Sequence, residues 1–487
     1  MLIDGAWVEP AGGEWFESIN PFTAKPWALI PRGTKADVDS AVAAARKAFT
    51  GKAWRGTNAS DRGALLRRLA DLLAEQSDSL AEIETIDNGK LISEMRAQLR
   101  YAPRWFHYFA GLADKIEGRV IPSDKPGFFN FTREEPLGVI AALTPWNSPL
   151  LLAAWKLAPA LAAGNTVVLK PSEHSSVSAL AFGELFEKAG FPPGVVNIVT
   201  GLGNEAGSAL IAHPDVAKVA FTGGDQTGQA VYEQAARGIK HVTLELGGKS
   251  ANIVFDDADL DQAVNGVVSG IFAATGQTCI AGSRALIHRP VYDAFVERLL
   301  ALARTARMGN PLDLSTQVGP ITTQPQYRKV LDYMTVAKNE GAVCLVGGGP
   351  ATRPECGSGW FVEPTIFAGV DAQMRIANEE VFGPLLALIP FDDEEEAIRI
   401  ANSTIYGLAA GAWTQNMRRA MSMAERLEAG TVWINCYRVT SYMTPFGGFK
   451  RSGLGREGGM EAIREYLQTK SVWIDLEGKT ANPFGLR

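Results

Sequence analysis

Residues 138–170 read GVIAALTPWNSPLLLAAWKLAPALAAGNTVVLK, and this stretch decides the fold class. The apolar runs at 138–144 and 166–170 are typical of buried strands. Between them, residues 150–163 are long enough for a crossover helix, which Gly164 ends. A strand, a crossover helix and a second strand predict a parallel pair of strands with the helix packed on one face.

The same alternation continues along the chain and predicts an α/β protein of two lobes, each with a parallel sheet. In the first lobe, a helix at 178–189 accompanies further strand candidates at 195–200, 218–222 and 241–245. In the second lobe, strand candidates lie at 251–255, 284–288, 385–391, 410–414 and 431–435. The chain has 487 residues, whereas single cores stop growing at roughly 250 to 300 residues. Two lobes are therefore expected.

Segments outside these two series predict a covering layer and an arm. Helical spacing at 36–49 and at 60–86, before a stop at Gly89, predicts helices that cover the first lobe. Residues 128–135 and 469–476 have β character but fit neither lobe. Strands that leave their own lobe often pair with a partner subunit, so a small oligomerisation arm is predicted, and an isolated hairpin is the equally weighted alternative.

Composition excludes several classes of function. The hydrophobic fraction of 46% and the net charge of -6 are ordinary for a globular protein and lack the basic field that nucleic acid or anionic lipid requires. The most apolar stretch, 139–169, is interrupted by prolines and polar residues, and the opening MLIDGAWVEP shows no export signal, so no membrane span is predicted. The four cysteines have no framework spacing, which predicts a reducing, cytoplasmic setting, and no metal site is predicted.

Cys279, in GQTCIAGSR, is the candidate nucleophile. It lies on a predicted loop before the strand at 284–288, and Gly276 and Gly282 would let its sulfur face a cleft beside backbone N–H groups. An inert buried thiol is the alternative, and it is the commoner fate of a lone cysteine.

Glu245 and Asn147 follow predicted strands, where α/β proteins place ligand groups. Glu245, in HVTLELGGKS, ends an apolar run, and burial there would raise its pKa towards the range of a general base. A loop cap or an arginine pair is the alternative for this carboxylate. Asn147, in LTPWNSPL, could donate a hydrogen bond to an oxyanion, although asparagine is also an ordinary helix cap.

Three segments are candidates for binding a dinucleotide cofactor. Lys170 and Glu173, in VVLKPSEHS, follow a strand, and a carboxylate there accepts hydrogen bonds from ribose hydroxyls but repels a 2′-phosphate, so NAD is favoured over NADP. The glycines of FTGGDQTG, 221–228, would let a pyrophosphate approach a helix N-terminus. In GLGNEAG, 201–207, the last glycine lies one residue too far for the GxGxxG fingerprint, so this segment is weak evidence by itself.

The motifs occur in one order and together closely resemble those of the aldehyde dehydrogenase superfamily. They are PWNSP, KPSE, LELGGKS, GQTCIAGSR, EEVFGP and PFGGFKRSGLGRE, and the resemblance extends from LIDGAW to TKSVWI. The presence of Glu245 makes the chain similar to the branch that hydrolyses its intermediate rather than passing the acyl group to coenzyme A.

The resemblance implies roles for four catalytic residues. Cys279 matches the nucleophile and Glu245 the general base, while Asn147 and the Cys279 N–H match the oxyanion hole. Glu457, in GREGG, matches a second carboxylate that relays protons. The expected course is addition of the thiolate to an aldehyde, loss of a hydride to the nicotinamide, and hydrolysis of the thioester by water that Glu245 deprotonates.

A cofactor site is also implied by the resemblance. Lys170 and Glu173 match residues that hold the adenosine ribose, and Glu380 and Phe382 match those that hold the nicotinamide ribose and ring. The full set of expected contacts is Thr144, Trp146, Lys170, Ser172, Glu173, Gly203, Gly207, Gly223, Gly224, Gly228, Glu380 and Phe382.

The same comparison implies a substrate tunnel. Its expected lining is Tyr101, Ser148, Leu152, Trp155, Ala273, Thr278, Ile280, Arg438, Thr440 and Phe446. Ser148 and Ala273 are small where several relatives have large aromatic residues, so a wide tunnel for bulky or aromatic aldehydes is predicted, with Trp155 and Phe446 as walls. Arg438 is interpreted either as a partner for the carboxylate of a semialdehyde or as a solvated or intersubunit arginine.

The resemblance further implies domain limits and a homo-oligomer. Residues 1–117 and 137–247 would form a Rossmann-like NAD-binding domain, and 248–449 the catalytic domain. Residues 118–136 and 464–487 would form the arm of a homodimer or homotetramer. The alternatives are a coenzyme A-acylating semialdehyde dehydrogenase, a silent NAD-binding protein, and a cofactor-free cysteine hydrolase, which would need a histidine partner for its thiol.

Overall fold

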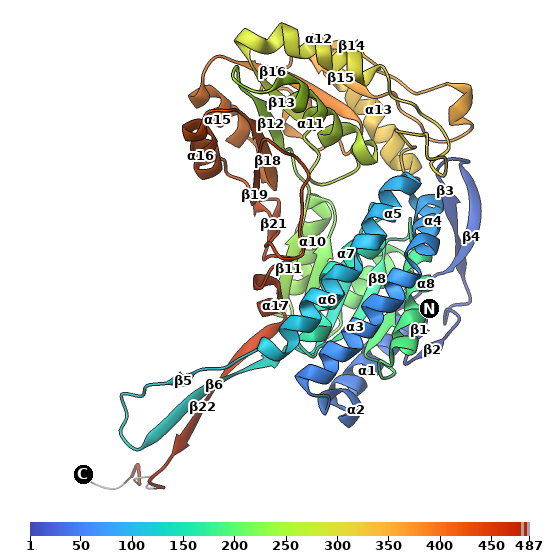
Figure 1. The fold of residues 1–487 in the computed structure, drawn as a ribbon. Coiled ribbons are helices and arrows are strands. Elements are labelled where there is room, and N and C mark those ends of the chain that lie inside the picture. Colours follow the sequence, from blue (N-terminus) through green and yellow to red (C-terminus); the bar gives the residue numbers. More distant parts are fainter. Residues whose placement is uncertain (479–481, 485–487) are drawn as a thin grey trace.

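The computed structural model describes residues 1–478 and 482–484, which form two α/β lobes and a long β arm (Figure 1). One lobe contains an eight-stranded sheet and the other a seven-stranded sheet. The fold class predicted from the sequence is confirmed. Among the described residues, no helix is both long and apolar enough to cross a membrane.

The first sheet has the order β2-β1-β9-β8-β7-β10-β11-β21, and its five central neighbours are parallel. These five are the strands predicted from the apolar runs. The antiparallel edges β1, β2 and β21 were not predicted, because strands of two residues carry no periodic pattern. The bounds are β1 Leu2–Ile3, β2 Ala6–Trp7, β7 Val139–Thr144, β8 Thr166–Pro171, β9 Val196–Ile198, β10 Val216–Thr222, β11 His241–Glu245 and β21 Gly453–Leu454.

Helices cover both faces of this sheet. Alternate residues of β7 enter different cores, with Ile140 packed in the core that contains α7 and Val139 in the core that contains α1. A parallel strand that is buried on both sides reads as a continuous apolar run, which explains why the strand could be recognised in the sequence. The covering helices include α1 Lys35–Thr50, α3 Ala59–Glu75, α6 Pro103–Leu112, α7 Pro149–Ala162, α8 Val177–Ala189 and α10 Asp225–Ala236.

The helical prediction over 60–86 needs a correction at Gln76. There α3 ends and α4 (Ser77–Asn88) begins, because the backbone of Gln76 leaves the helical region with φ -95° and ψ 3°. Both helices contact α8, but α3 packs mainly on α6 and α4 mainly on α5 (Ile92–Tyr101). Apolar spacing continues across the turn, so periodicity alone could not reveal it. The predicted stop is confirmed, since Gly89 ends α4 with φ 76°.

The second sheet has the order β14-β15-β16-β13-β12-β18-β19. The sheet is parallel from β15 to β19, and the five predicted strands are β12, β13, β16, β18 and β19. The parallel neighbour β15 and the antiparallel edge β14 were not predicted. The bounds are β12 Ala251–Val254, β13 Arg284–His288, β14 Val343–Val346, β15 Thr365–Ala368, β16 Leu385–Phe391, β18 Ala409–Trp413 and β19 Thr431–Ile434. Its main helices are α11 Leu260–Phe272, α12 Tyr292–Ala303, α13 Gln324–Asn339, α15 Glu394–Asn402 and α16 Met417–Arg426.

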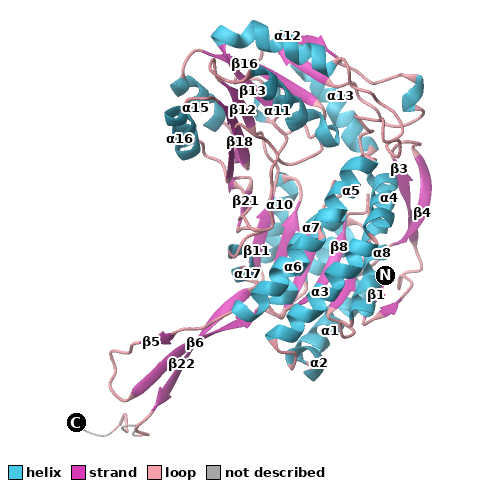
Figure 2. Cartoon of the chain, in the orientation of Figure 1, coloured by secondary structure: helices cyan, strands magenta, loops and turns pink. Residues whose placement is uncertain are grey.

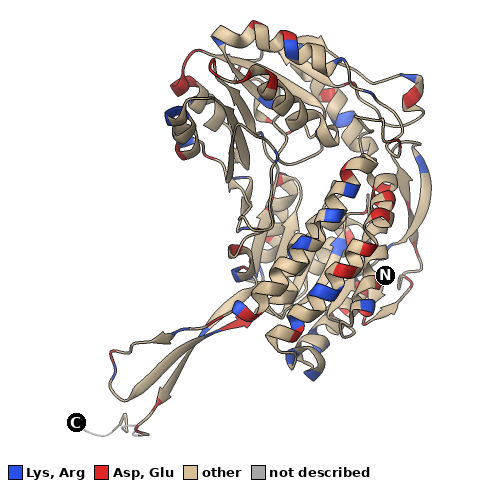
Figure 3. Ribbon diagram, in the orientation of Figure 1, with Lys and Arg blue, Asp and Glu red and all other residues tan. Residues whose placement is uncertain are grey.

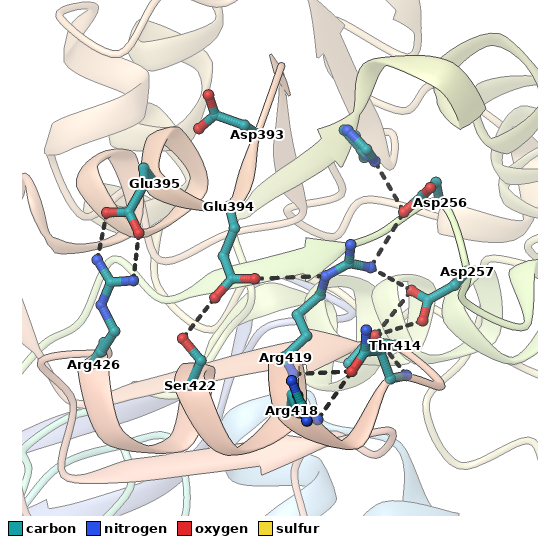
Figure 4. Close-up of polar contacts among 12 residues, drawn as sticks. Asp256, Asp257, Asp393, Glu394, Glu395, Thr414, Arg418, Arg419, Ser422 and Arg426 are labelled. Atoms are coloured by element: carbon teal, nitrogen blue, oxygen red, sulfur yellow. Dashed lines mark hydrogen bonds and ion pairs between the residues drawn. The ribbon is translucent and has the colours of Figure 1, made fainter.

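An ionic cluster ties α15 and α16 to the end of β12 (Figure 4). Arg419 of α16 lies 2.7 Å from Asp257 and 3.2 Å from Asp256, and its guanidinium also lies over the ring of Phe255. On α15, Glu394 faces the same guanidinium. Elsewhere acidic and basic residues are interspersed along the ribbon in Figure 3, as the modest net charge suggests.

The arm is a three-stranded antiparallel sheet that projects from the first lobe (Figure 2). It contains β5 Val120–Ile121, β6 Phe128–Pro136 and β22 Leu467–Asp475. The two predicted arm segments pair with each other in register from Leu467 opposite Pro136 to Asp475 opposite Phe128. Of the predicted arm, residues 479–481 and 485–487 lie outside the described residues.

Candidate active site

Cys279 lies on a loop between the short helical turn Ala273–Gly276 and β13. The approach to it has unusual backbone geometry, with positive φ at Ala274, Thr275 and Gly276. Only glycine fits at position 276, because the Cβ of any other residue would lie 2.2 Å from the carbonyl oxygen of Gly383. The loop thus holds a half-buried thiol in a fixed place. Burial, and then the charges of Glu245 and Glu380, raise the pKa of this thiol to about 12.

Glu245 ends β11, and its carboxylate is buried. Neither carboxylate oxygen has a hydrogen-bond partner among the described residues. Burial, and then the charge of Glu457, raise the pKa of Glu245 well above its ordinary value. The chain then runs through Gly247 and Gly248 beside the nucleophile loop, where a Cβ on Gly248 would lie 2.7 Å from the Cys279 carbonyl oxygen. Glu245 and Cys279 therefore share one site.

Asn147 lies in the loop between β7 and α7, and its side chain faces the nucleophile loop. Its Nδ2 donates a 3.0 Å hydrogen bond to the carbonyl of Gln277, two residues before Cys279. The amide is buried. The structure thus brings the predicted oxyanion donor and the predicted nucleophile together from opposite lobes.

Glu457 is joined to α7 by a buried ion pair. Lys156 Nζ lies 2.5 Å from Glu457 Oε1 and donates a second hydrogen bond of 2.6 Å to Thr222. The second carboxylate oxygen of Glu457 has no partner among the described residues. Glu457 pairs with Phe446 in an isolated β-bridge, and a Cβ on the following Gly447 would lie 2.9 Å from Glu245 Oε1, so the two carboxylates lie close together.

Four of the predicted cofactor contacts lie together at the end of β8 and beyond it, namely Lys170, Glu173, Gly203 and Gly207. Lys170 Nζ lies 3.2 Å from Glu173 Oε2, and Glu173 Oε1 accepts from the N–H of Gly203 at 3.4 Å. A Cβ on Gly207 would lie 3.9 Å from the Lys170 side chain. Burial alone would raise the pKa of Glu173, but the charge of Lys170 leaves it below its ordinary value, so the carboxylate stays ionised.

Gly223 and Gly224 form the turn between β10 and α10. A Cβ added to Gly224 would meet no other atom within 4 Å, so this turn is open to an approaching group. Gly228 packs inwards, where a Cβ would clash with Leu246 at 2.3 Å. The acidic Asp225 that follows is paired with Arg451 at 3.4 Å, which reduces its repulsion of a phosphate.

Glu380 and Phe382 reach the first lobe from a loop after α14 (Arg375–Asn378). Glu380 Oε1 accepts from the N–H of Gly248 at 3.0 Å, three residues after Glu245 in the sequence. The ring of Phe382 meets that of Trp146 edge to face, with centroids 5.3 Å apart. Gln326 fixes this loop by donating to the carbonyls of residues 381 and 382.

An aromatic wall borders a cavity of about 390 Å³ beside the predicted tunnel. Trp155 stacks on Trp105 at 5.3 Å and meets Phe446 edge to face at 5.1 Å. Tyr442 extends the wall by contact with Trp105. Of the predicted lining, Trp155, Thr440 and Phe446 border this cavity, together with Trp105 and Glu457.

The other predicted substrate residues do not border that cavity. Ser148 bonds to Lys90, and Arg438 donates to the carbonyls of Ser269 and Ala273. Ile280 accepts from Tyr437 through its carbonyl. The remaining predicted residues are placed as follows: Tyr101 packs on Trp105, Leu152 is in the core, Thr144 Oγ1 and Thr278 Oγ1 are buried without a partner among the described residues, and Ser172 Oγ accepts from the His174 N–H.

Several residues of the site were not predicted. Lys156 could have been predicted from the sequence, because a single lysine inside the apolar helix 150–163 has to be paired when it is buried. Lys90 and Gln326 could not have been predicted, since both lie in polar segments whose partners are distant in the sequence. Trp105 and Tyr442 resemble ordinary core aromatics.

Comparisons with known proteins agree with this geometry. A model of the Aldehyde dehydrogenase family matches residues 7–472. The chain is similar to aldehyde dehydrogenase 1A1 of Gallus gallus, at 46% identity over 99% of this chain and 94% of the relative. It is also similar to (Z)-2-((N-methylformamido)methylene)-5-hydroxybutyrolactone dehydrogenase of Acinetobacter baylyi, at 46% identity over 100% and 99%. The crystal structure of betaine aldehyde dehydrogenase from Staphylococcus aureus in complex with NAD+ has a TM-score of 0.98, at 41% identity over 100% and 96%.

Fold and site together define an NAD(P)-dependent oxidoreductase that acts on aldehydes. The chain belongs to the aldehyde dehydrogenase family. The coenzyme A-acylating alternative finds no support among these relatives.

Proposed function

We propose that the chain oxidises an aldehyde to a carboxylic acid with NAD, through a thioester on Cys279 that is hydrolysed with Glu245 as general base. The observation that carries this proposal is the position of Glu245. Its carboxylate is buried and unpartnered among the described residues, and the chain that follows it passes the nucleophile loop, where a Cβ on Gly248 would lie 2.7 Å from the Cys279 carbonyl oxygen. A carboxylate with a raised pKa beside a nucleophile is suited to take a proton from water.

The first half of the reaction forms a carbon–sulfur bond. The Cys279 thiolate adds to the aldehyde carbon, and the oxyanion that develops is stabilised by the Asn147 amide and the Cys279 N–H. One of the two Nδ2 hydrogens of Asn147 is donated to the carbonyl of Gln277 in this structure, so the other N–H is available to the oxyanion. NAD, when bound, accepts the hydride that leaves the aldehyde carbon.

The second half breaks the carbon–sulfur bond. Glu245 removes a proton from water as the water oxygen bonds to the thioester carbon, and Cys279 leaves as a thiolate.

The side chains and the open glycine turn of the first lobe are suited to bind NAD. Glu173 would accept hydrogen bonds from the adenosine ribose, Lys170 would fix that carboxylate, and the open turn at Gly224 would admit the pyrophosphate. Glu380 and Phe382 would hold the nicotinamide end. The relative from Staphylococcus aureus is described with NAD+ bound, which supports the same choice. NADP is less favoured, because Glu173 would repel a 2′-phosphate.

A bulky or aromatic aldehyde is the proposed substrate class. The cavity of about 390 Å³ and the wall of Trp105, Trp155 and Phe446 support it. A carboxylate-bearing semialdehyde is the second candidate, because Arg438 pairs with no acidic side chain in the described part of the chain and bonds only to carbonyls.

Domain roles and assembly follow the same reasoning. Residues 1–117 and 137–247 are assigned to NAD binding and 248–449 to catalysis. The arm is assigned to a homodimer or homotetramer, since Phe128 and Trp473 expose large apolar side chains on a sheet with free edges.

The test is a panel of aromatic, short aliphatic and carboxylate-bearing aldehydes with NAD and with NADP, without coenzyme A, on wild type and Cys279→Ala. NADH and free acid in equal amounts from wild type alone are the expected result. A requirement for a thiol acceptor, or an active Cys279→Ala variant, would contradict the mechanism. A short aliphatic aldehyde with by far the highest kcat/KM would contradict the substrate class.

A further inference from the structure

Three consecutive residues ahead of the nucleophile have a left-handed backbone conformation. Their φ angles are 53° at Ala274, 53° at Thr275 and 69° at Gly276, and all three residues are buried. Residues other than glycine adopt this conformation at an energetic cost, because their Cβ approaches the following carbonyl oxygen, and they remain there only where the surrounding structure holds them. Contacts from outside the turn are therefore needed to keep its shape.

Glu94 of α5 makes one of these contacts. Its Oε1 accepts a 2.6 Å hydrogen bond from the backbone N–H of Ala274. Its Oε2 is buried, and the N–H of Ala274 is the only hydrogen-bond partner of this carboxylate within the described residues. Glu94 lies in the first turn of α5, at the end of the first lobe that faces the second lobe (Figure 1). A side chain of the first lobe thus holds a strained turn of the second.

Arg438 holds the same peptide group from its other side. Its Nη1 donates to the carbonyl of Ala273 at 3.1 Å and to that of Ser269 at 3.2 Å. The carbonyl of Ala273 and the N–H of Ala274 belong to one trans peptide group, in which they point in opposite directions. The 273–274 peptide group is therefore fixed between Glu94 and Arg438.

The position of this turn determines the position of two groups of the proposed active site. The N–H of Gln277 donates to the carbonyl of Ala274 at 3.0 Å, and the carbonyl of Gln277 accepts from Asn147. Cys279 follows Gln277 by two residues. A rotation of the 273–274 peptide group would displace both the thiol and the amide.

We propose that Glu94 is a positioning residue for the nucleophile, and that Glu94 and Arg438 together hold the 273–274 peptide group in place. The inference rests on the proposed role of Cys279. Without these contacts, Ala274 and Thr275 relax from their left-handed conformation, and the sulfur moves away from the aldehyde carbon. Attack depends steeply on the distance and direction from which the sulfur approaches, so the first turnover becomes slower. The proposed cofactor contacts lie on other loops, so the affinity for NAD stays the same.

Glu94→Ala is the decisive variant. Glu94→Gln is its conservative counterpart, because the Oε1 of glutamine can still accept from the N–H of Ala274. Stopped-flow absorbance at saturating NAD and aldehyde measures the first turnover of NADH. Its rate should fall by about tenfold or more in Glu94→Ala and stay near the wild-type rate in Glu94→Gln. The Kd for NAD, measured by tryptophan fluorescence, should be the same in all three proteins.

Glu82→Ala is the matched control, because it removes an exposed carboxylate from α4, the helix that packs on α5. It should keep the wild-type rate. Arg438→Met tests the other side of the peptide group and should slow the first turnover of an uncharged aldehyde. An unchanged rate with that aldehyde would overturn the proposal that both side chains hold the peptide group.

A wild-type first turnover in Glu94→Ala would also overturn the proposal. Equal losses in Glu94→Ala and Glu94→Gln would do the same, since they would indicate the charge of Glu94 rather than its hydrogen bond. A Kd for NAD that rises together with the loss of rate would indicate a general loosening of the cleft, which contradicts a positioning role.

Cys279→Ala in the same assay separates this inference from the proposed function. If Cys279→Ala still gives a first turnover of NADH, the proposed mechanism itself fails. If that turnover requires Cys279 but is as fast in Glu94→Ala as in wild type, the mechanism stands and only the positioning role of Glu94 fails.

Discussion

Lys90 Nζ donates a 3.0 Å hydrogen bond to Ser148 Oγ, and this bond closes a ring around the nucleophile loop. Ser148 Oγ donates to the backbone carbonyl of Asn147, and the side-chain amide of Asn147 donates to the carbonyl of Gln277. From Gln277 the ring returns through Thr322 and Asn88 to the backbone N–H of Lys90. The ring joins both lobes, so the position of the oxyanion donor depends on a buried ammonium.

Removal of the Ser148 hydroxyl should therefore lower both stability and activity. Ser148→Ala leaves the Lys90 ammonium without this acceptor, which should cost about 1 to 3 kcal/mol of unfolding free energy. We expect kcat to fall while KM for NAD stays unchanged, because the cofactor contacts lie elsewhere. Steady-state kinetics and urea unfolding check this, with Ser148→Thr as the control that keeps a hydroxyl. Equal kcat in all three proteins would contradict the role of the ring.

Glu245→Gln should separate acylation from hydrolysis. The variant keeps the size of the side chain but cannot take a proton from water, so a first turnover of NADH should appear and the steady state should fall by about 100-fold or more. Stopped-flow absorbance of NADH measures both phases. Cys279→Ala should show neither phase. A Glu245→Gln enzyme with the wild-type steady state would exclude Glu245 as the base.

Reactivity of Cys279 in the cofactor-free protein should rise with pH. Burial and the charges of Glu245 and Glu380 raise the pKa of the thiol to about 12. The thiolate fraction therefore increases throughout the range from neutral to alkaline pH, without a plateau. Removal of a negative charge should lower that pKa, so Glu380→Gln should alkylate faster than wild type at the same pH. Rates of iodoacetamide labelling measure this, and a plateau near pH 7 would contradict it.

Glu173→Gln should shift preference towards NADP. The substitution removes the charge that repels a 2′-phosphate and leaves the charge of Lys170 unpaired. The ratio of kcat/KM for NADP to that for NAD should rise by about tenfold, or ~1.4 kcal/mol. Glu184→Gln, an exposed carboxylate on α8, is the control for a change of net charge. An unchanged ratio would remove Glu173 from cofactor selection.

The ionic cluster of Figure 4 should stabilise the second lobe in a pH-dependent way. Burial acts to raise the pKa of Asp256, but His288 and Arg419 lower it below its ordinary value. A lowered pKa in the folded state gives stability that is present above about pH 4, the unfolded value, and is lost as the pH falls through the folded value. Arg419→Met should therefore lower Tm at pH 7, and the difference from wild type should shrink below about pH 4.

Thermal unfolding at several pH values measures this effect. Arg418→Met is a suitable control, because Arg418 is an exposed neighbour on α16 that makes no ion pair with a described carboxylate. A Tm difference that stays constant down to pH 3 would indicate packing of Arg419 on Phe255, rather than its charge, as the cause.

Much of the fold could be predicted because the central strands of both sheets are buried on both faces. Such strands read as unbroken apolar runs, as at Val139–Thr144 and Leu385–Phe391. The edges could not be predicted, since Leu2–Ile3 and Gly453–Leu454 are too short to show a period. The break at Gln76 was missed for a different reason, because helical spacing continues on both sides of it.

By itself, the sequence determined which residue types are available for chemistry and on which local elements they lie. Cys279 follows Gly276 on a loop, and Glu245 lies at the end of a strand. Those features are local, because strand ends, turns and helix starts depend on a few neighbouring residues. Only the tertiary structure decided that Lys156 meets Glu457, 301 residues away in the sequence, and that Lys90 supports Asn147 through Ser148. Such pairs depend on how helices and sheets pack, and no periodicity along the chain encodes the partner of a buried charge.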